Sequence, residues 1–258
     1  FGTGRGDWLN HEWLAELLFY RVYQVLGLDG LFLFRTLVVV MAFAVLPLWS
    51  ARRARASMPW ACAMVLGAAA AAEGWAFFDA RAYLITYLGL AGTLFLANET
   101  LRTGDWRFLL PVPFGTALWA NCHGAFILGP MVLLLLALGC LFPPRSTRLA
   151  RVMTLVAIGT LALCAISTPF GFGILAFPFS LIGPSAFTVG LNEWARPDLL
   201  RQLPFLALLL VSAALTPRMD WPRRLGLFCF LGAGLLAWRH APLAALMAAF
   251  TLPSAMPR

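Results

Sequence analysis

The sequence predicts an all-α protein, a polytopic transmembrane helical bundle with about nine membrane segments. Its 258 residues are 61% hydrophobic and only 12% charged, which is too few charges to cover a soluble domain of this length. Between Gly30 and Pro253 the chain is a series of apolar runs. All 19 basic residues are arginines, and most of them stand in the short spacers between these runs. We therefore expect the runs to be membrane helices joined by arginine-bearing loops.

The chain divides into an outer segment, residues 1–29, and a transmembrane helical domain, residues 30–258. Residues 9–26 place apolar side chains at spacings of three to four, which predicts an amphipathic helix lying in the outer membrane interface. Residues 169–183 are rich in proline, glycine and aromatics and predict an interfacial elbow. The nine predicted membrane segments are 30–50, 59–78, 83–100, 108–121, 125–142, 152–168, 203–216, 225–238 and 241–253.

The arginines also predict the orientation of the bundle. If the segments alternate, the arginine-rich spacers 51–58, 101–107, 143–151 and 217–224 all lie on one side. The positive-inside rule makes that side cytoplasmic. Eight of the eleven acidic residues and all three histidines then lie on the opposite, extracytoplasmic face. Acidic residues contribute little to orientation, so their bias indicates that the working face is outside.

The most specific local pattern is a turn at Asn121-Cys122-His123-Gly124. Both flanks of the surrounding apolar stretch carry arginines of the inner side, so the chain must cross twice, as an antiparallel helical hairpin with this turn at its outer tip. Asn121 and His123 are candidates for substrate contact or proton transfer. The alternative is that they cap two helix ends.

Three further outer segments carry candidate binding residues, each with a simpler alternative. Arg81 follows Asp79 and is more readily interpreted as half of a surface ion pair. Glu193 and Arg196 lie in the longest outer loop, which is either a binding element or a solvated loop. Arg239 and His240 form a short turn that could bind a phosphate or anchor at lipid headgroups.

Other function classes find no support in the sequence. The net charge of +8 is spread over loops and does not form the clustered basic face of a nucleic-acid-binding protein. The five cysteines have no CxxC spacing and are expected to be small core residues. No spacing of histidines, cysteines and carboxylates demands a metal ion, and no Walker, HExxH or serine-triad motif is present.

The chain resembles bacterial membrane proteins that are themselves similar to glycosyltransferases of the GT-C superfamily. The resemblance is carried in order by WLNHEWLAE (8–16), RAYLIT (81–86), LWANCHGAF (118–126), TPFG (168–171), Glu193-Trp194 and RHAP (239–242). It implies an inverting transferase that uses a polyprenyl-phosphate sugar at the outer face of the bacterial inner membrane. The roles it suggests are Glu12 or Asp7 as base, Arg239 with Arg81 or Arg196 as phosphate-binding cations, and His123 with Asn121 as positioning groups.

The sequence departs from that family in two places. Members usually begin with a further transmembrane helix and an acidic outer segment, whereas this chain starts inside the first outer loop, and Thr168 stands where an asparagine is usual. We therefore expect a core without its N-terminal helix, either because that helix precedes Phe1 in a longer chain or because the protein has lost it. The alternative function is a non-catalytic scaffold or accessory subunit of a larger membrane complex, respiratory or photosynthetic, with lipids as its other partners.

The two functions predict different arrangements of the outer polar residues. In a transferase core, Glu12, His123, Glu193 and Arg239 should converge on one outward-facing cavity below the amphipathic helix. In a scaffold their lateral positions would be unrelated. Convergence of these four residues is thus the structural test of the active-site interpretation.

Overall fold

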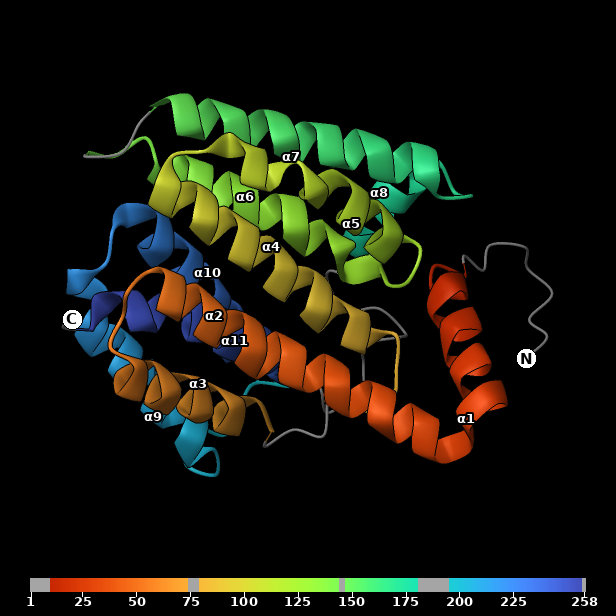
Figure 1. Ribbon diagram of the computed structural model, residues 1–258, viewed down its shortest axis with the longest axis horizontal. Helices are drawn as coiled ribbons and strands as arrows, with labels where there is room; N and C mark the ends of the chain where they lie inside the picture. Colours follow the sequence, from red (N-terminus) through yellow and green to blue (C-terminus); the bar gives the residue numbers. More distant parts are fainter. Residues whose placement is uncertain (1–9, 74–78, 144–146, 181–194, 257–258) are drawn as a thin grey trace.

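The computed structural model describes residues 10–73, 79–143, 147–180 and 195–256, and over these ranges the chain forms helices and no strand. The helices are stacked in a bundle and many run roughly side by side (Figure 1). Among the described residues, three helical stretches are long and apolar enough to cross a membrane: Trp13–Arg53, Tyr83–Thr103 and Thr147–Ser167. The predicted all-α class is confirmed, and apolar helices able to span a bilayer are present. The count of about nine spans stays a prediction.

The first long helical stretch is bent where the sequence predicts a change from interface to membrane. Helix α1 spans Trp13–Val40, but Gly27 inside it has φ 65° and ψ −157°, a conformation that residues with a Cβ avoid. The bend separates residues 13–26 from the helix that continues through a π-helical turn, Met41–Val45, into α2, Leu46–Arg53 (Figure 1). The predicted helix 9–26 is thus observed from Trp13 onward.

The next four helices include the predicted hairpin. Helix α3 spans Met58–Glu73, and α4, Tyr83–Thr103, ends at Gly104, whose φ of 76° forms a left-handed cap. A 3₁₀ turn, Trp106–Leu109, then leads into α5, Pro111–Ala120, and α6, Leu128–Gly139, follows the 3₁₀ turn Gly124–Ile127. The predicted break at residues 121–124 is confirmed, and the two helices run in opposite directions (Figure 1).

The C-terminal half completes the bundle. Helix α7 spans Thr147–Ser167, the short α8 spans Gly173–Ser180, and α9, α10 and α11 span Leu203–Leu215, Trp221–Leu236 and Ala241–Thr251. Short 3₁₀ turns lie at Thr216–Arg218, Trp238–His240 and Leu252–Ala255. Proline stands in the first two positions of α9, α10 and α11, where its missing N–H costs no helical hydrogen bond.

Two helices begin earlier than their apolar runs predict. Helix α7 starts at Thr147 and not at 152, and α10 starts at Trp221 and not at 225. The side chain of Asp220 accepts a hydrogen bond from the backbone N–H of Arg223 and so caps α10, which begins four residues before the apolar run. The spacers are therefore shorter than hydropathy predicts, and some of their arginines lie on the first turns of helices.

Helices α4 and α11 form the centre of the bundle. Every residue of α11 from Ala241 to Thr251 is buried, as expected of a helix that is apolar on all sides. In the most apolar 18 residues of α4, 61% of the residues are buried. The corresponding share is 22% in the first long stretch and 33% in α7. The outer helices therefore present exposed apolar faces, which suits contact with lipid.

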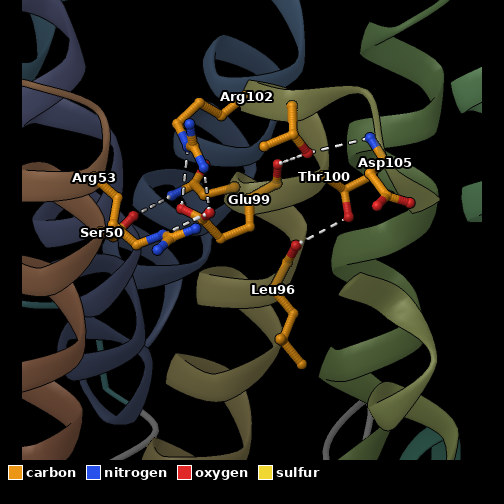
Figure 2. A network of polar contacts seen from close by, with 9 residues as sticks. Ser50, Arg53, Leu96, Glu99, Thr100, Arg102 and Asp105 are labelled. Atoms are coloured by element: carbon orange, nitrogen blue, oxygen red, sulfur yellow. Dashed lines mark hydrogen bonds and ion pairs between the residues drawn. The ribbon is translucent and has the colours of Figure 1, made fainter. Parts of the chain in front are cut away.

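The described residues of the four arginine-rich spacers lie at one end of the bundle, on the left of Figure 1, and the 121–124 turn lies at the other. At the arginine-rich end, Glu99 is 1% exposed and its Oε2 lies 2.7 Å from both Arg53 Nε and Arg102 Nη2. Figure 2 shows Glu99 between these two arginines, which joins the ends of α2 and α4. This clamp fixes the arginine-rich end independently of the polar residues at the other.

Candidate functional site

Glu12 and His123, which are distant in sequence, meet at the end of the bundle opposite the arginine-rich spacers. The Oε1 atom of Glu12 lies 3.5 Å from Nε2 of His123 and 3.6 Å from Nε2 of His11. The Glu12 side chain is 37% exposed and the His123 side chain only 12%, so the carboxylate lies on the open side of the pair. Glu12 directly precedes α1, and its backbone N–H donates to the side-chain oxygen of Asn10.

Hydrogen bonds on its inner side hold the ring of His123. Its Nδ1 lies 2.9 Å from Oγ1 of Thr86 on α4 and accepts the backbone N–H of Ala125 at 3.2 Å. The buried indole of Trp119 donates to the same Thr86 oxygen at 3.1 Å. A Cβ on Gly89 would lie 2.5 Å from the Trp119 ring, so this glycine lets α5 place its tryptophan against α4.

Tyr83 connects His123 to the late Arg-His turn. The Tyr83 and His123 rings meet edge to face at 5.1 Å, and the guanidinium carbon of Arg239 lies 5.7 Å from the centre of the Tyr83 ring. The hydroxyl of Tyr83 also donates to the Arg239 carbonyl oxygen at 3.1 Å. Arg239 is therefore part of the same cluster, although it lies on a different segment of the chain.

A second aromatic contact packs beside the hairpin turn. The ring of His11 lies 4.1 Å from that of Phe177 on α8 and 6.2 Å from that of His123. A Cβ on Gly124 would come within 2.8 Å of Phe177 and 3.2 Å of His11. Glycine at the turn thus allows the segment before α1 to lie directly on the hairpin tip.

The electrostatics of the pair favour a neutral histidine beside a carboxylic acid that binds protons readily. Partial burial raises the pKa of Glu12 above its usual value, and Glu16 adds to this, although His11 and Arg239 oppose it. Burial, with the charges of His11 and Arg239, lowers the pKa of His123 to about 3. At neutral pH His123 is therefore uncharged, and Glu12 binds a proton more readily than an exposed glutamate does.

Asn121 joins the cluster through structural contacts. Its Oδ1 accepts the indole N–H of Trp13 at 3.1 Å, and its carbonyl oxygen accepts the backbone N–H of Leu14. Its amide group donates to the carbonyl oxygens of Ala117 and Ser167. The Asn121 side chain thus connects α1 and α7 to the hairpin tip.

The remaining predicted residues lie away from this pair or outside the described ranges. Arg81 is 71% exposed and lies 3.5 Å from Asp79, the surface pair that the sequence favours. Arg196 is exposed, and its neighbour Ala195 accepts a hydrogen bond from the Trp238 backbone N–H. Burial, with Arg239, lowers the pKa of His240 to about 4. Asp7 and Glu193 fall outside the described residues, so three of the four residues expected to converge are located, and all three are close together.

Sequence reasoning did not single out Tyr83, Thr86 or Trp119. Tyr83 and Thr86 belong to RAYLIT (81–86) and Trp119 to LWANCHGAF (118–126), and Tyr83 and Thr86 are three residues apart, on one face of a helix. That spacing, with two polar groups in an apolar run, was the available signal. The residue that all three support directly or indirectly, His123, lies in the turn between α5 and α6.

The arrangement offers a carboxylate, a neutral imidazole and a guanidinium at one end of a membrane bundle. Within the described ranges, no group of three histidine, cysteine or carboxylate side chains is placed to hold a metal ion. The cluster can therefore accept a proton at Glu12, donate a hydrogen bond from His123 and bind an anion at Arg239. Comparison of the chain with protein-family models, with curated proteins and with solved structures finds no match in any of the three.

Proposed function

We propose that the protein is a glycosyltransferase that uses a polyprenyl-phosphate sugar at the extracytoplasmic face of the membrane. The observation that carries the proposal is the meeting of Glu12, His123 and Arg239 at the end of the bundle opposite the arginine-rich spacers. A scaffold has no need to gather a carboxylate, an imidazole and a guanidinium from three distant segments. The resemblance to GT-C-like proteins supports the same reaction class.

In the proposed reaction Glu12 is the base. Its carboxylate takes the proton of the acceptor hydroxyl, the acceptor oxygen attacks the anomeric carbon, and the bond from that carbon to the phosphate oxygen breaks. The electron pair leaves with the polyprenyl phosphate, and the anomeric configuration inverts. A raised pKa suits Glu12 to this role, because a stronger base takes the proton more readily.

Arg239 is the cation for the departing phosphate. Its position over Tyr83 and its hydrogen-bonded carbonyl oxygen fix the turn that carries it. A guanidinium matches the geometry of phosphate oxygens and stays charged at every physiological pH. The apolar faces of the neighbouring helices would hold the polyprenyl chain in the bilayer.

The test is transfer from a defined donor in a membrane. The full-length protein is reconstituted in liposomes with radiolabelled polyprenyl-phosphate hexoses and an extract of outer-face glycan acceptors, and release of polyprenyl phosphate is measured. Glu12→Gln should abolish release, whereas Asp105→Asn, which lies at the arginine-rich end and caps the turn Trp106–Leu109, should retain it. Arg239→Ala should weaken donor binding, and Arg201→Ala, an exposed arginine, should not. Equal activity of wild type and Glu12→Gln would contradict the proposed transferase and favour the alternative, a non-catalytic scaffold.

A further inference from the structure

The structure assigns to Thr86 and Trp119 the role of positioning residues that hold His123 as a fixed hydrogen-bond donor to Glu12. This inference rests on the proposed function for its catalytic meaning, but the hydrogen-bond chain behind it is a property of the fold. Neither residue touches Glu12, and each acts through the imidazole of His123.

The direction of each hydrogen bond in the chain is determined by its donors. An indole N–H can only donate, so Trp119 gives its proton to Thr86 Oγ1 at 3.1 Å. The backbone N–H of Ala125 donates to Nδ1 of His123, so that nitrogen carries no proton of its own. The Thr86 hydroxyl, 2.9 Å away, must then donate to Nδ1 as well.

The tautomer of His123 follows from these directions. A neutral imidazole with a bare Nδ1 carries its single proton on Nε2. Nε2 is the atom that lies 3.5 Å from the Glu12 carboxylate. His123 therefore presents an N–H to Glu12, and two donors at Nδ1 oppose a second protonation of the ring.

In this arrangement Glu12 and His123 have different roles, Glu12 as base and His123 as hydrogen-bond donor. His123 cannot take a proton at Nε2, because that atom already holds one, and Nδ1 faces the protein interior. Glu12 is left as the only base of the pair, and the N–H of His123 orients its carboxylate. The chain Trp119–Thr86–His123–Glu12 crosses from α5 through α4 to the hairpin turn and the start of α1.

Nitrogen NMR of the protein labelled with ¹⁵N-histidine tests the tautomer without any substrate. The chain has three histidines, and the signal lost in His123→Gln identifies the one in question. At pH 7 we expect a bare Nδ1 and a protonated Nε2 for His123. A protonated Nδ1, alone or together with Nε2, would overturn the inference.

Two variants of Thr86 separate positioning from general structural support. Thr86→Val keeps the shape and loses the hydroxyl, so the pKa of His123 should rise by about one unit, the size expected for one neutral hydrogen bond. Thr86→Ser keeps the hydroxyl and should restore the wild-type titration. An unchanged pKa in Thr86→Val, or an equal rise in Thr86→Ser, contradicts the role.

Two variants of His123 give the catalytic readout. Glutamine carries an N–H near the position of Nε2, whereas asparagine reaches only the position of Nδ1. His123→Gln should therefore retain more kcat than His123→Asn, with KM for the donor similar in both. Equal loss in the two would mean that donation from Nε2 has no role. Absence of turnover in the wild type would refute the proposed transferase, while the NMR result would still decide the hydrogen-bond chain.

Discussion

The indole N–H of Trp13 donates to Oδ1 of Asn121 at 3.1 Å across 108 residues of sequence. This contact ties the first turn of α1 to the tip of the α5–α6 hairpin, and the N–H of Leu14 binds the carbonyl oxygen of the same asparagine. The carboxylate of Glu12, one residue before Trp13, is held within reach of His123 by these two bonds.

Asn121→Ala should therefore loosen the start of α1. The change leaves the Trp13 donor unpaired, and it should cost about 1–3 kcal/mol of stability. Hydrogen exchange over residues 10–26 should accelerate. Gln24→Ala, at an exposed contact with Tyr20 on the same helix, is the control and should leave exchange near Asn121 unchanged. Equal protection in both variants would show that the Trp13 contact does not hold the helix.

Gly89→Ala should disturb Trp119 from the opposite helix. Its Cβ would lie 2.5 Å from the indole, so the ring or α4 must move, at a cost of about 1–3 kcal/mol. The bond from Trp119 to Thr86 should lengthen, visible as a shift of the Trp119 indole N–H resonance. Gly92→Ala on the same helix meets no atom within 4 Å and is the matched control. A wild-type melting temperature for Gly89→Ala would refute the close packing.

Stability should fall as the pH is lowered below about 6.5, the pKa of an unfolded histidine. The pKa of folded His123 is lowered to about 3, so between these values the unfolded chain binds a proton that the native protein does not. This one residue should cost about 2 kcal/mol by pH 5. Melting temperatures in detergent from pH 8 to pH 5 measure the effect. His240, whose pKa is lowered to about 4, contributes in the same direction. His123→Gln should therefore reduce the fall in stability without abolishing it, and an identical slope in both proteins would contradict the buried neutral imidazole.

Cysteine labelling of intact cells tests the orientation. In a cysteine-free background, Ala80→Cys should react with a membrane-impermeant reagent added outside, because residue 80 is exposed in the turn before α4. Ser57→Cys, in an arginine-rich spacer, should react only after the membrane is opened. The reverse pattern would place the Glu12 cluster in the cytoplasm and remove the extracytoplasmic reaction.

Much of the fold could be predicted because apolar runs in a membrane protein coincide with helices. The break at residues 121–124 and the bend near residue 27 follow from glycine and polar residues that interrupt those runs. The early start of α10 could not be read from hydropathy, since the Asp220 cap allows the helix to begin before its apolar run, with two arginines in its first turn.

Glu12, His123 and Arg239 could be predicted from the sequence, whereas the predicted cations Arg81 and Arg196 lie away from them and the residues that support the cluster were not predicted. Glu12, His123 and Arg239 stand out because charged and imidazole groups are rare in this chain. Thr86 and Trp119 are ordinary in an apolar helix until the partner helix is known. Asn121 is the opposite case. The sequence makes it a candidate for substrate contact, but its side-chain oxygen and its amide group both form hydrogen bonds within the protein.

In a bilayer, the bend at Gly27 would give the protein a tolerance to membrane thickness. Membrane helices adapt to thicker or thinner bilayers chiefly by tilting. A straight α1 would transmit any tilt of residues 28–53 to Trp13 and so pull Glu12 away from His123. With a glycine at φ 65° between the two parts, the long segment can change its angle while Asn121 keeps the first turn in place. The Glu12–His123 distance would thereby stay the same in membranes of different lipid composition.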